Sequence, residues 1–226
     1  MIWRVGLIDS CGAWSGAVDA AAFASEGTHV ERVSPAPDPT GHGSRIAGLL
    51  TEDGATVELL LAQVFLNARP ASPAAVAAGV DWAASHGAHL IHLSLGLAAD
   101  RAVLRAAVAR AVDSGIVVVA AMPARGEPVY PAAYPTVIGG TGDARCGPGE
   151  ISTLGPRLFG GCPRTARVVR GGTMGGRGGA SAGAAWVSKA IVHLPVGTQA
   201  DAAIDALRAT ARHVGPERRR EPHPLA

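Results

Sequence analysis

The alternation of strand-like and helix-like segments is the feature that most constrains how this chain can fold. Apolar runs of strand length at 3–9, 57–65 and 116–121 are separated by segments whose apolar residues recur at helical spacing. Strands that alternate with helices predict an α/β fold with three layers: a mainly parallel sheet and helices on both of its faces. With 226 residues, 48% of them hydrophobic, the chain can build one domain with its own core.

The same patterns predict the individual elements. We expect strands over 3–9, 28–33, 57–65, 89–95 and 116–121, with a further strand near 134–138 after a loop, and helices over 44–50, 72–86, 100–114, 181–192 and 199–212. The alanine-rich segment 17–24 favours a short helix. We expect one compact domain over 1–213, followed by a basic and flexible tail over 214–226.

Composition excludes several classes of protein. The net charge of +2 combines −5 over 1–150 with +7 over 151–226, but no nucleic-acid-binding motif accompanies the basic half. No apolar run approaches the roughly 20 residues of a membrane span, and the N-terminal residues do not resemble a secretory signal. We therefore expect a cytoplasmic protein that binds neither nucleic acid nor membrane. Three cysteines fit a reducing compartment, although a bridge between Cys146 and Cys162 stays open.

Functional sites of α/β folds lie beyond the carboxyl ends of the strands, and three polar residues are expected in such positions here. Asp9 ends the first strand, His42 lies between two glycines at a helix start, and Ser181 begins a helix after a glycine-rich segment. A serine hydroxyl becomes a nucleophile when an imidazole takes its proton, and a buried carboxylate can orient that imidazole. The chain offers one residue for each role.

Each of these residues also has a purely structural explanation. Asp9 could cap a helix or bind a ribose hydroxyl, and His42 is one of eight histidines. Ser181 could be an N-cap, which helix starts favour. The segment 178–181 could form a phosphate-binding turn, although it lacks the Gly-Lys-Ser/Thr ending of that motif.

The residues that flank the three candidates resemble the subtilisin-like serine proteases. Val5-Gly6-Leu7-Ile8-Asp9-Ser10 is similar to the family's aspartate segment, and His42-Gly43-Ser44-Arg45-Ile46-Ala47-Gly48 to its histidine segment. Gly179-Ala180-Ser181-Ala182-Gly183-Ala184 is similar to its serine segment. The resemblance runs from residue 3 to about 213 and implies a subtilisin-like fold and a serine endopeptidase with Asp9, His42 and Ser181 as its triad.

The chain departs from the family at the oxyanion site. Members usually place an asparagine after the strand that matches 117–121, and its side chain helps to bind the oxyanion. Ala124 takes that position here and cannot donate, which in this chemistry costs roughly 100- to 1000-fold in turnover. Either the enzyme is slow or another group, such as Arg125, takes the role.

Two further departures concern calcium and folding. The segment 51–55 is too short for the family's calcium loop, and Glu52 and Asp53 fall short of the six to eight oxygens that Ca²⁺ takes. We therefore expect no metal and no cofactor. Because Asp9 lies so close to Met1, we also expect no inhibitory pro-segment of the kind that the family carries. Together these departures favour an intracellular enzyme that folds unaided and has narrow specificity.

The resemblance also implies how a polypeptide substrate binds. Subtilisin-like proteases add the substrate as a β-strand, and the matching edge here is Leu93, Ser94, Leu95 and Gly96. Arg125 matches the mouth of the primary pocket and Val129 a position near its floor. A shallow pocket with an acidic or polar preference follows, unless Arg125 is only a solvated surface residue.

This compact form is similar to subtilisin-like maturation proteases that remove the leader of one modified peptide, such as those of quinohemoprotein amine dehydrogenase biogenesis. The expected partner is then a leader-bearing modified peptide. Two alternatives remain open, a general intracellular peptidase and a subtilisin-like module that binds peptides with little or no catalysis.

Overall fold

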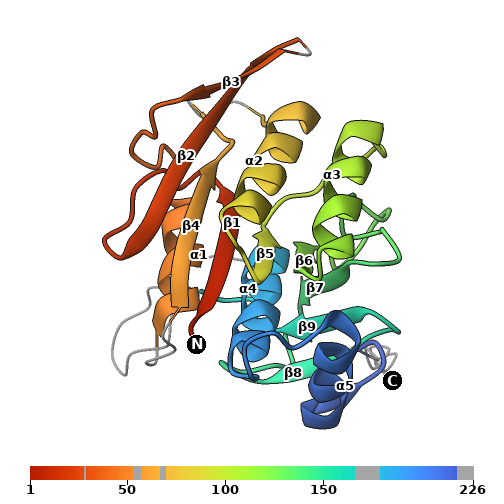
Figure 1. Ribbon diagram of the computed structural model, residues 1–226. Coiled ribbons are helices and arrows are strands. Elements are labelled where there is room, and N and C mark those ends of the chain that lie inside the picture. The colour runs from red at the N-terminus through yellow and green to blue at the C-terminus, as the bar shows by residue number, and fades with distance from the viewer. Residues whose placement is uncertain (28, 53–56, 67–69, 166–178, 218–226) are drawn as a thin grey trace, which may run out of the picture.

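A computed structural model describes residues 1–226 except 28, 53–56, 67–69, 166–178 and 218–226 (Figure 1). The strands are β1 (Trp3–Asp9), β2 (Ala17–Glu26), β3 (His29–Val33), β4 (Val57–Gln63), β5 (Leu90–Leu93), β6 (Val117–Ala121), β7 (Ile138–Gly142), β8 (Ile151–Thr153), β9 (Leu158–Gly161) and β10 (His213–Val214). The helices are α1 (His42–Thr51), α2 (Pro73–Ser85), α3 (Ala102–Asp113), α4 (Gly179–Val192) and α5 (Ala200–Thr210).

The described strands form one sheet in the order β10-β8-β9-β7-β6-β5-β1-β4-β2-β3. Neighbouring strands run parallel except for the β2–β3 and β8–β9 pairs, which are antiparallel. Helices α2 and α3 cover one face, while α1, α4 and α5 cover the other. This arrangement confirms the predicted three-layer α/β fold with a mainly parallel sheet.

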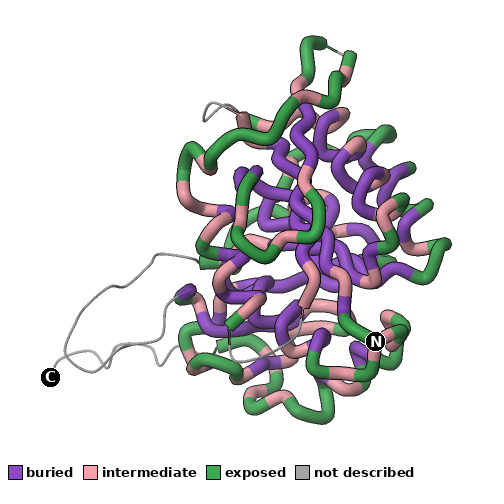
Figure 2. The backbone as a smooth tube through the Cα atoms, turned by 60° about the vertical axis from the view of Figure 1, so that its left-hand side comes forward, coloured by how far each residue is buried: buried purple, intermediate pink, exposed green. Residues whose placement is uncertain are grey.

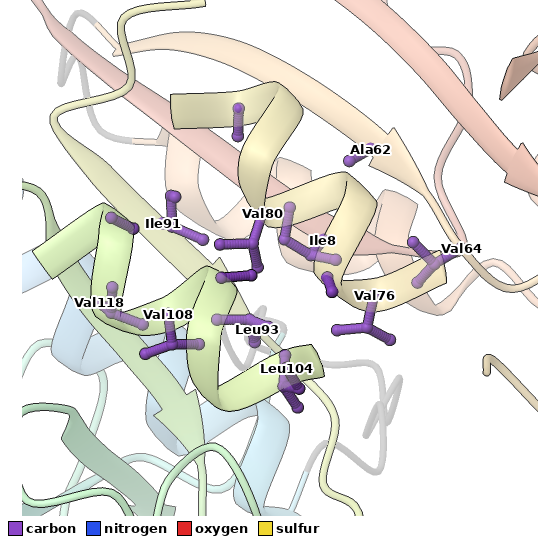
Figure 3. Packing of buried hydrophobic residues seen from close by; sticks show 14 of the residues in the cluster. Ile8, Ala62, Val64, Val76, Val80, Ile91, Leu93, Leu104, Val108 and Val118 are labelled. Atoms are coloured by element: carbon purple, nitrogen blue, oxygen red, sulfur yellow. The ribbon is translucent and has the colours of Figure 1, made fainter. Parts of the chain in front are cut away.

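The core lies in two apolar layers, one on each face of the central strands. Figure 3 shows the first layer, in which Ile8 and Leu93 from the sheet pack against Val80 of α2 and Leu104 of α3. The second layer lies beneath α1, α4 and α5 and includes Phe159. Buried backbone therefore runs through the middle of the molecule, with exposed loops around it (Figure 2). A sheet held on both faces is a rigid support for residues at its edge.

The helix predicted at 17–24 is wrong, because this segment is strand β2. It pairs in parallel with β4 and antiparallel with β3, and Phe23 packs against Trp82 of α2 with ring centroids 6.4 Å apart. Alanine favours helices only weakly, so strand pairing and burial decide the structure here.

The glycine-rich part of the sheet also differs from the prediction. The segment expected as a strand near 134–138 is mostly turn, and β7 begins only at Ile138. The short strands β8 and β9 gave no clear pattern in the sequence. Five of the nine residues in β7 and β9 are glycines, which lack the side chains that a period-two pattern requires.

The C-terminal boundary expected at residue 213 falls inside β10. Val214 pairs with Thr153, and the Gly215 amide donates to the Thr153 carbonyl oxygen at 2.8 Å. Residues 218–226 of the predicted tail lie outside the described residues. Cys146 and Cys162 are both buried free thiols rather than a disulfide. Among the described helices, none has the length and apolarity that crossing a membrane requires.

Candidate active site

Asp9 and His42 form a close pair at the carboxyl end of β1. The His42 Nδ1 atom lies 2.9 Å from Asp9 Oδ1 and 3.0 Å from Oδ2. The carboxylate is 1% exposed and also accepts hydrogen bonds from the Ser10 amide and hydroxyl. A buried carboxylate on Nδ1 fixes the ring and leaves Nε2 as the nitrogen able to exchange a proton.

The turn that precedes α1 is organised by Asp38, whose part the sequence did not reveal. Its Oδ2 accepts from the Ser44 amide at 2.8 Å and from the Ser44 hydroxyl at 2.7 Å, and its Oδ1 accepts from the Gly41 amide. The amide of His42 donates to Thr40 Oγ1. Asp38 therefore satisfies the free amides at the start of the helix that carries His42.

A glycine after His42 lets α1 approach β1. A Cβ atom at Gly43 would lie 2.5 Å from the Cys11 amide nitrogen and 3.0 Å from Asp9 Oδ1. Such distances are closer than van der Waals contact allows, so a side chain would push the helix away from Asp9. The Gly43 amide also donates to Ser10 Oγ at 3.0 Å.

These contacts set the charge state of the site. The hydrogen bond that His42 donates to Asp9, reinforced by the negative charge of Asp9, raises the pKa of His42 above its usual value, although burial works in the opposite direction. Burial would raise the pKa of Asp38, but the hydrogen bonds from Ser44 and Ser10 outweigh it and lower that pKa to about 2. Asp38 is therefore ionised throughout the range in which His42 titrates.

Ser181 lies in the first turn of α4, and tight packing sets its place. A Cβ atom at Gly183 would lie 1.8 Å from the Thr141 carbonyl oxygen, and one at Gly140 would lie 2.4 Å from Ala184 Cα. Helix α4 therefore rests directly on the backbone of β7. The predicted glycine-rich segment before this helix falls mostly in 166–178, outside the described residues.

Ser94 connects Ser181 to the Asp9–His42 pair. The Ser181 hydroxyl donates to the Ser94 carbonyl oxygen at 3.3 Å. Ser94 in turn lines a cavity of about 450 Å³ together with Asp9 and His42, and Phe65 and Pro70 form part of its wall. The strand register explains this meeting, because Ile8 pairs with Leu93 and the next residue on each strand reaches the same edge.

The hydrogen bonds found among the described residues include none between Ser181 Oγ and His42. In enzymes a catalytic hydrogen bond often becomes short and well aligned only when substrate binds. The Ser181 hydroxyl is instead bonded to the main chain of Ser94, the residue after β5, which lines the cavity together with His42.

Four residues were predicted to form the substrate-binding edge, and they differ in position. Leu93 is fully buried within β5 and pairs with Ile8 on one side and Ala120 on the other. Because both of its sides pair with neighbouring strands, Leu93 cannot pair with a substrate strand. Ser94, Leu95 and Gly96 continue beyond the strand, so the predicted edge narrows to these three residues.

The two predicted pocket residues lie in different places. Val129 packs against Gly96, where an added Cβ would be 2.4 Å from Val129 Cγ2. Arg125 instead lines a separate cavity of about 550 Å³, together with Ala124, Thr141 and Asp143. Ala124 and Arg125 are both exposed. The described residues contain no cluster of three or more histidines, cysteines and carboxylates that could hold a metal ion.

A buried histidine beneath the site was also missed by the sequence analysis. His92 lies in β5 with no exposed surface, and its ring nitrogens contact Ser188 Oγ of α4 at 2.9 Å and Ser94 Oγ at 2.6 Å. A single histidine inside an otherwise apolar strand was the available signal, but its partners are 96 and 2 residues away.

Part of the chain is similar in sequence to bacterial subtilisins. The chain is 32% identical to subtilisin DY of Bacillus licheniformis over 137 residues, which cover 54% of this chain and 50% of that protein. It is also 32% identical to subtilisin Savinase of Lederbergia lenta over 108 residues, 43% of this chain and 40% of that protein. The matches thus span half or less of these relatives. No protein-family model matches the chain.

Solved structures agree on the fold. The prenylagaramide maturation protease PagA superposes with a TM-score of 0.59 and 14% identity, covering 84% of this chain and 73% of that one. A mutant of the protease domain of PatA gives 0.58 and 20%, covering 84% and 78%. This chain is therefore similar to subtilisins over about half of its sequence, and it has the fold of these two proteases.

Proposed function

We propose that this protein is a serine endopeptidase in which Ser181 is the nucleophile, His42 the general acid and base, and Asp9 the residue that orients His42. The observation that carries the proposal is the buried Asp9 carboxylate, held by both oxygens against His42 Nδ1 at one end of the cavity that Ser94 also lines. Similarity to subtilisins on the sequence side supports the same activity.

The reaction follows from these contacts. The Ser181 hydroxyl turns from the Ser94 carbonyl toward His42 Nε2 and gives up its proton as Oγ attacks the scissile carbonyl carbon. The Ser181 amide donates to the oxyanion. The C–N bond then breaks and His42 passes its proton to the leaving amine. Water, deprotonated by His42, hydrolyses the acyl ester and restores the serine.

We infer that the polypeptide substrate lies along Ser94–Gly96 as an added strand. The side chain before the scissile bond meets the place where Val129 fills the space beside Gly96, so a small residue fits best. Because Arg125 lines the other cavity, its positive charge acts on a different part of the substrate and favours an acidic or polar group there.

We further propose a narrow role inside the cell, the removal of a leader or pro-peptide from a dedicated substrate such as a leader-bearing modified peptide. The shallow space at Val129 supports a restricted substrate range, and PagA, a structural neighbour, is a maturation protease. A weakly catalytic peptide-binding module is the second candidate, because Ser181 Oγ is bonded to Ser94 and the oxyanion position holds Ala124.

Covalent labelling tests the activity without a known substrate. A fluorophosphonate probe is expected to label the protein once, at Ser181, and Ser181→Ala is expected to abolish labelling and peptide cleavage while its thermal unfolding stays cooperative. Ser114→Ala, an exposed serine at the end of α3, is the matched control and should label like the wild type. A wild-type protein that binds peptides but is never labelled would support the binding module instead.

A further inference from the structure

His92 is a polar residue in an apolar layer directly beneath the candidate active site. In β5 it lies between Leu7 of β1 and Val119 of β6, both of which are fully buried. One ring nitrogen, Nδ1, is 2.9 Å from Ser188 Oγ, and the other, Nε2, is 2.6 Å from Ser94 Oγ. The imidazole therefore bridges helix α4 and the end of strand β5.

The bridge is chemically complete when the imidazole is neutral. Burial, together with the charge of nearby His42, lowers the pKa of His92 to about 3. A neutral imidazole has one N–H donor and one acceptor, and a serine hydroxyl can take either role. All three side chains can thus be satisfied without a buried charge.

The candidate nucleophile Ser181 also connects α4 to Ser94, two helical turns from Ser188. Ser188 follows Ser181 by seven residues, so both lie on the same face of α4. Ser181 bonds to the main chain of Ser94, while Ser188 bonds through His92 to the side chain of Ser94. Helix α4 is therefore bonded at two points to the short segment 92–94, which spans the end of β5 and the residue after it.

We propose that His92 is a positioning residue, which through Ser188 and Ser94 holds the nucleophile helix and the substrate-binding strand in one register. The proposal rests on the proposed role of Ser181. An apolar side chain would fill the same space but would allow α4 and β5 to shift relative to each other. A buried hydrogen-bonded bridge satisfies all its donors and acceptors in only one relative position of the two elements. Displacements of about 1 Å at a reacting group can cost about 100-fold in rate.

The test compares variants of the bridge by their rate of fluorophosphonate labelling. His92→Phe, which keeps a flat ring but loses both hydrogen bonds, is expected to label about 10- to 100-fold more slowly. Ser188→Ala should show a smaller loss, and combining the two should add little, because both remove the same bridge. His92→Gln, whose amide can still reach Ser94, should label faster than His92→Phe.

The matched control is Ser152→Ala in β8. Ser152 is equally buried and its hydroxyl bonds to Asp143 Oδ2 at 2.6 Å, four places along the sheet from β5. This variant is expected to melt at a lower temperature yet label at the wild-type rate. A folded His92→Phe that labels like the wild type, or His92→Gln no faster than His92→Phe, would overturn the proposal.

Amide hydrogen exchange separates this proposal from the proposed function. Loss of the bridge should speed exchange in β5 and in the first half of α4, while Ser152→Ala should leave both segments unchanged. If the wild type is not labelled but exchange rises in these segments, the protease assignment fails, and His92 bridges α4 and β5 without positioning a nucleophile. Unchanged exchange in folded His92→Phe would refute the positioning role, whether or not the wild type is labelled.

Discussion

The two halves of the candidate site are held in different ways. The Asp9–His42 half is a hydrogen-bonded assembly in which Asp38 and Ser10 satisfy the surrounding amides. The Ser181 half depends on close packing of α4 against β7, and its hydroxyl makes one 3.3 Å bond to main chain. The general base is thus oriented before substrate arrives, whereas the nucleophile must still turn toward it.

The largest effect should come from Asp9→Asn, which weakens the hydrogen-bonded half. Labelling is expected to fall by roughly 10⁴-fold, because an amide no longer favours the productive tautomer of His42. Since Asp9 raises the pKa of His42, the acidic limb of the rate–pH profile should move to lower pH in the variant. An unchanged limb would show that Asp9 does not control His42.

The same pair has a consequence for stability. A raised folded-state pKa stabilises the protonated protein, so this contribution is complete below the unfolded histidine value of about 6.5. It is lost as pH rises through the folded pKa of His42. The stability difference between wild type and Asp9→Asn should therefore shrink with rising pH across this window, as urea unfolding at several pH values can measure.

Gly183→Ala tests the packed half. Its methyl group would meet the Thr141 carbonyl, so the helix must move, at an expected cost of about 1–3 kcal/mol in unfolding free energy together with a marked loss of labelling. Gly48→Ala in α1 is the matched control, because its nearest neighbour would be Trp14 at 3.5 Å. There alanine should stabilise by about 0.5–1 kcal/mol. Equal melting temperatures for the two variants would contradict the comparison.

Smaller changes are expected at the oxyanion position. Ala124→Asn should raise turnover if a donor is missing there, since one such donor is worth roughly 100-fold or more when well placed. Arg125→Ala distinguishes two roles. A fall in kcat alone would assign Arg125 to the oxyanion, while a higher KM for acidic peptides would assign it to substrate binding. Wild-type kinetics on every peptide would make Arg125 a bystander.

The smallest effect is expected from metal removal. Melting curves recorded with and without a chelator should coincide, because a bound ion would raise the stability of the folded state by mass action. Part of the short segment 51–55 lies outside the described residues, so this expectation rests on its length. A drop of several degrees under chelation would contradict it.

Much of the fold could be predicted because local pattern and tertiary role agree. The apolar run that ends in Asp9 reads as a buried strand whether or not its neighbours are known, and Ser72 before Pro73 marks the start of α2 by a local rule. The segments around His42 and Ser181 likewise carry their signal in a few adjacent residues. In β2 the local pattern and the tertiary role conflict. Pairing with β4 there outweighs the preference of alanine for helices.

The sequence by itself therefore determined the order of layers and the identity of the three candidate triad residues. Only the tertiary structure decided that Leu93 is enclosed between strands, that Arg125 and Val129 face separate spaces, and that His92 bridges to Ser188. The physical reason is the separation in sequence between the residues that interact. A strand or helix start is encoded within about one turn of chain, but a hydrogen bond between residues 96 positions apart exists only once strand register and helix packing have brought them together.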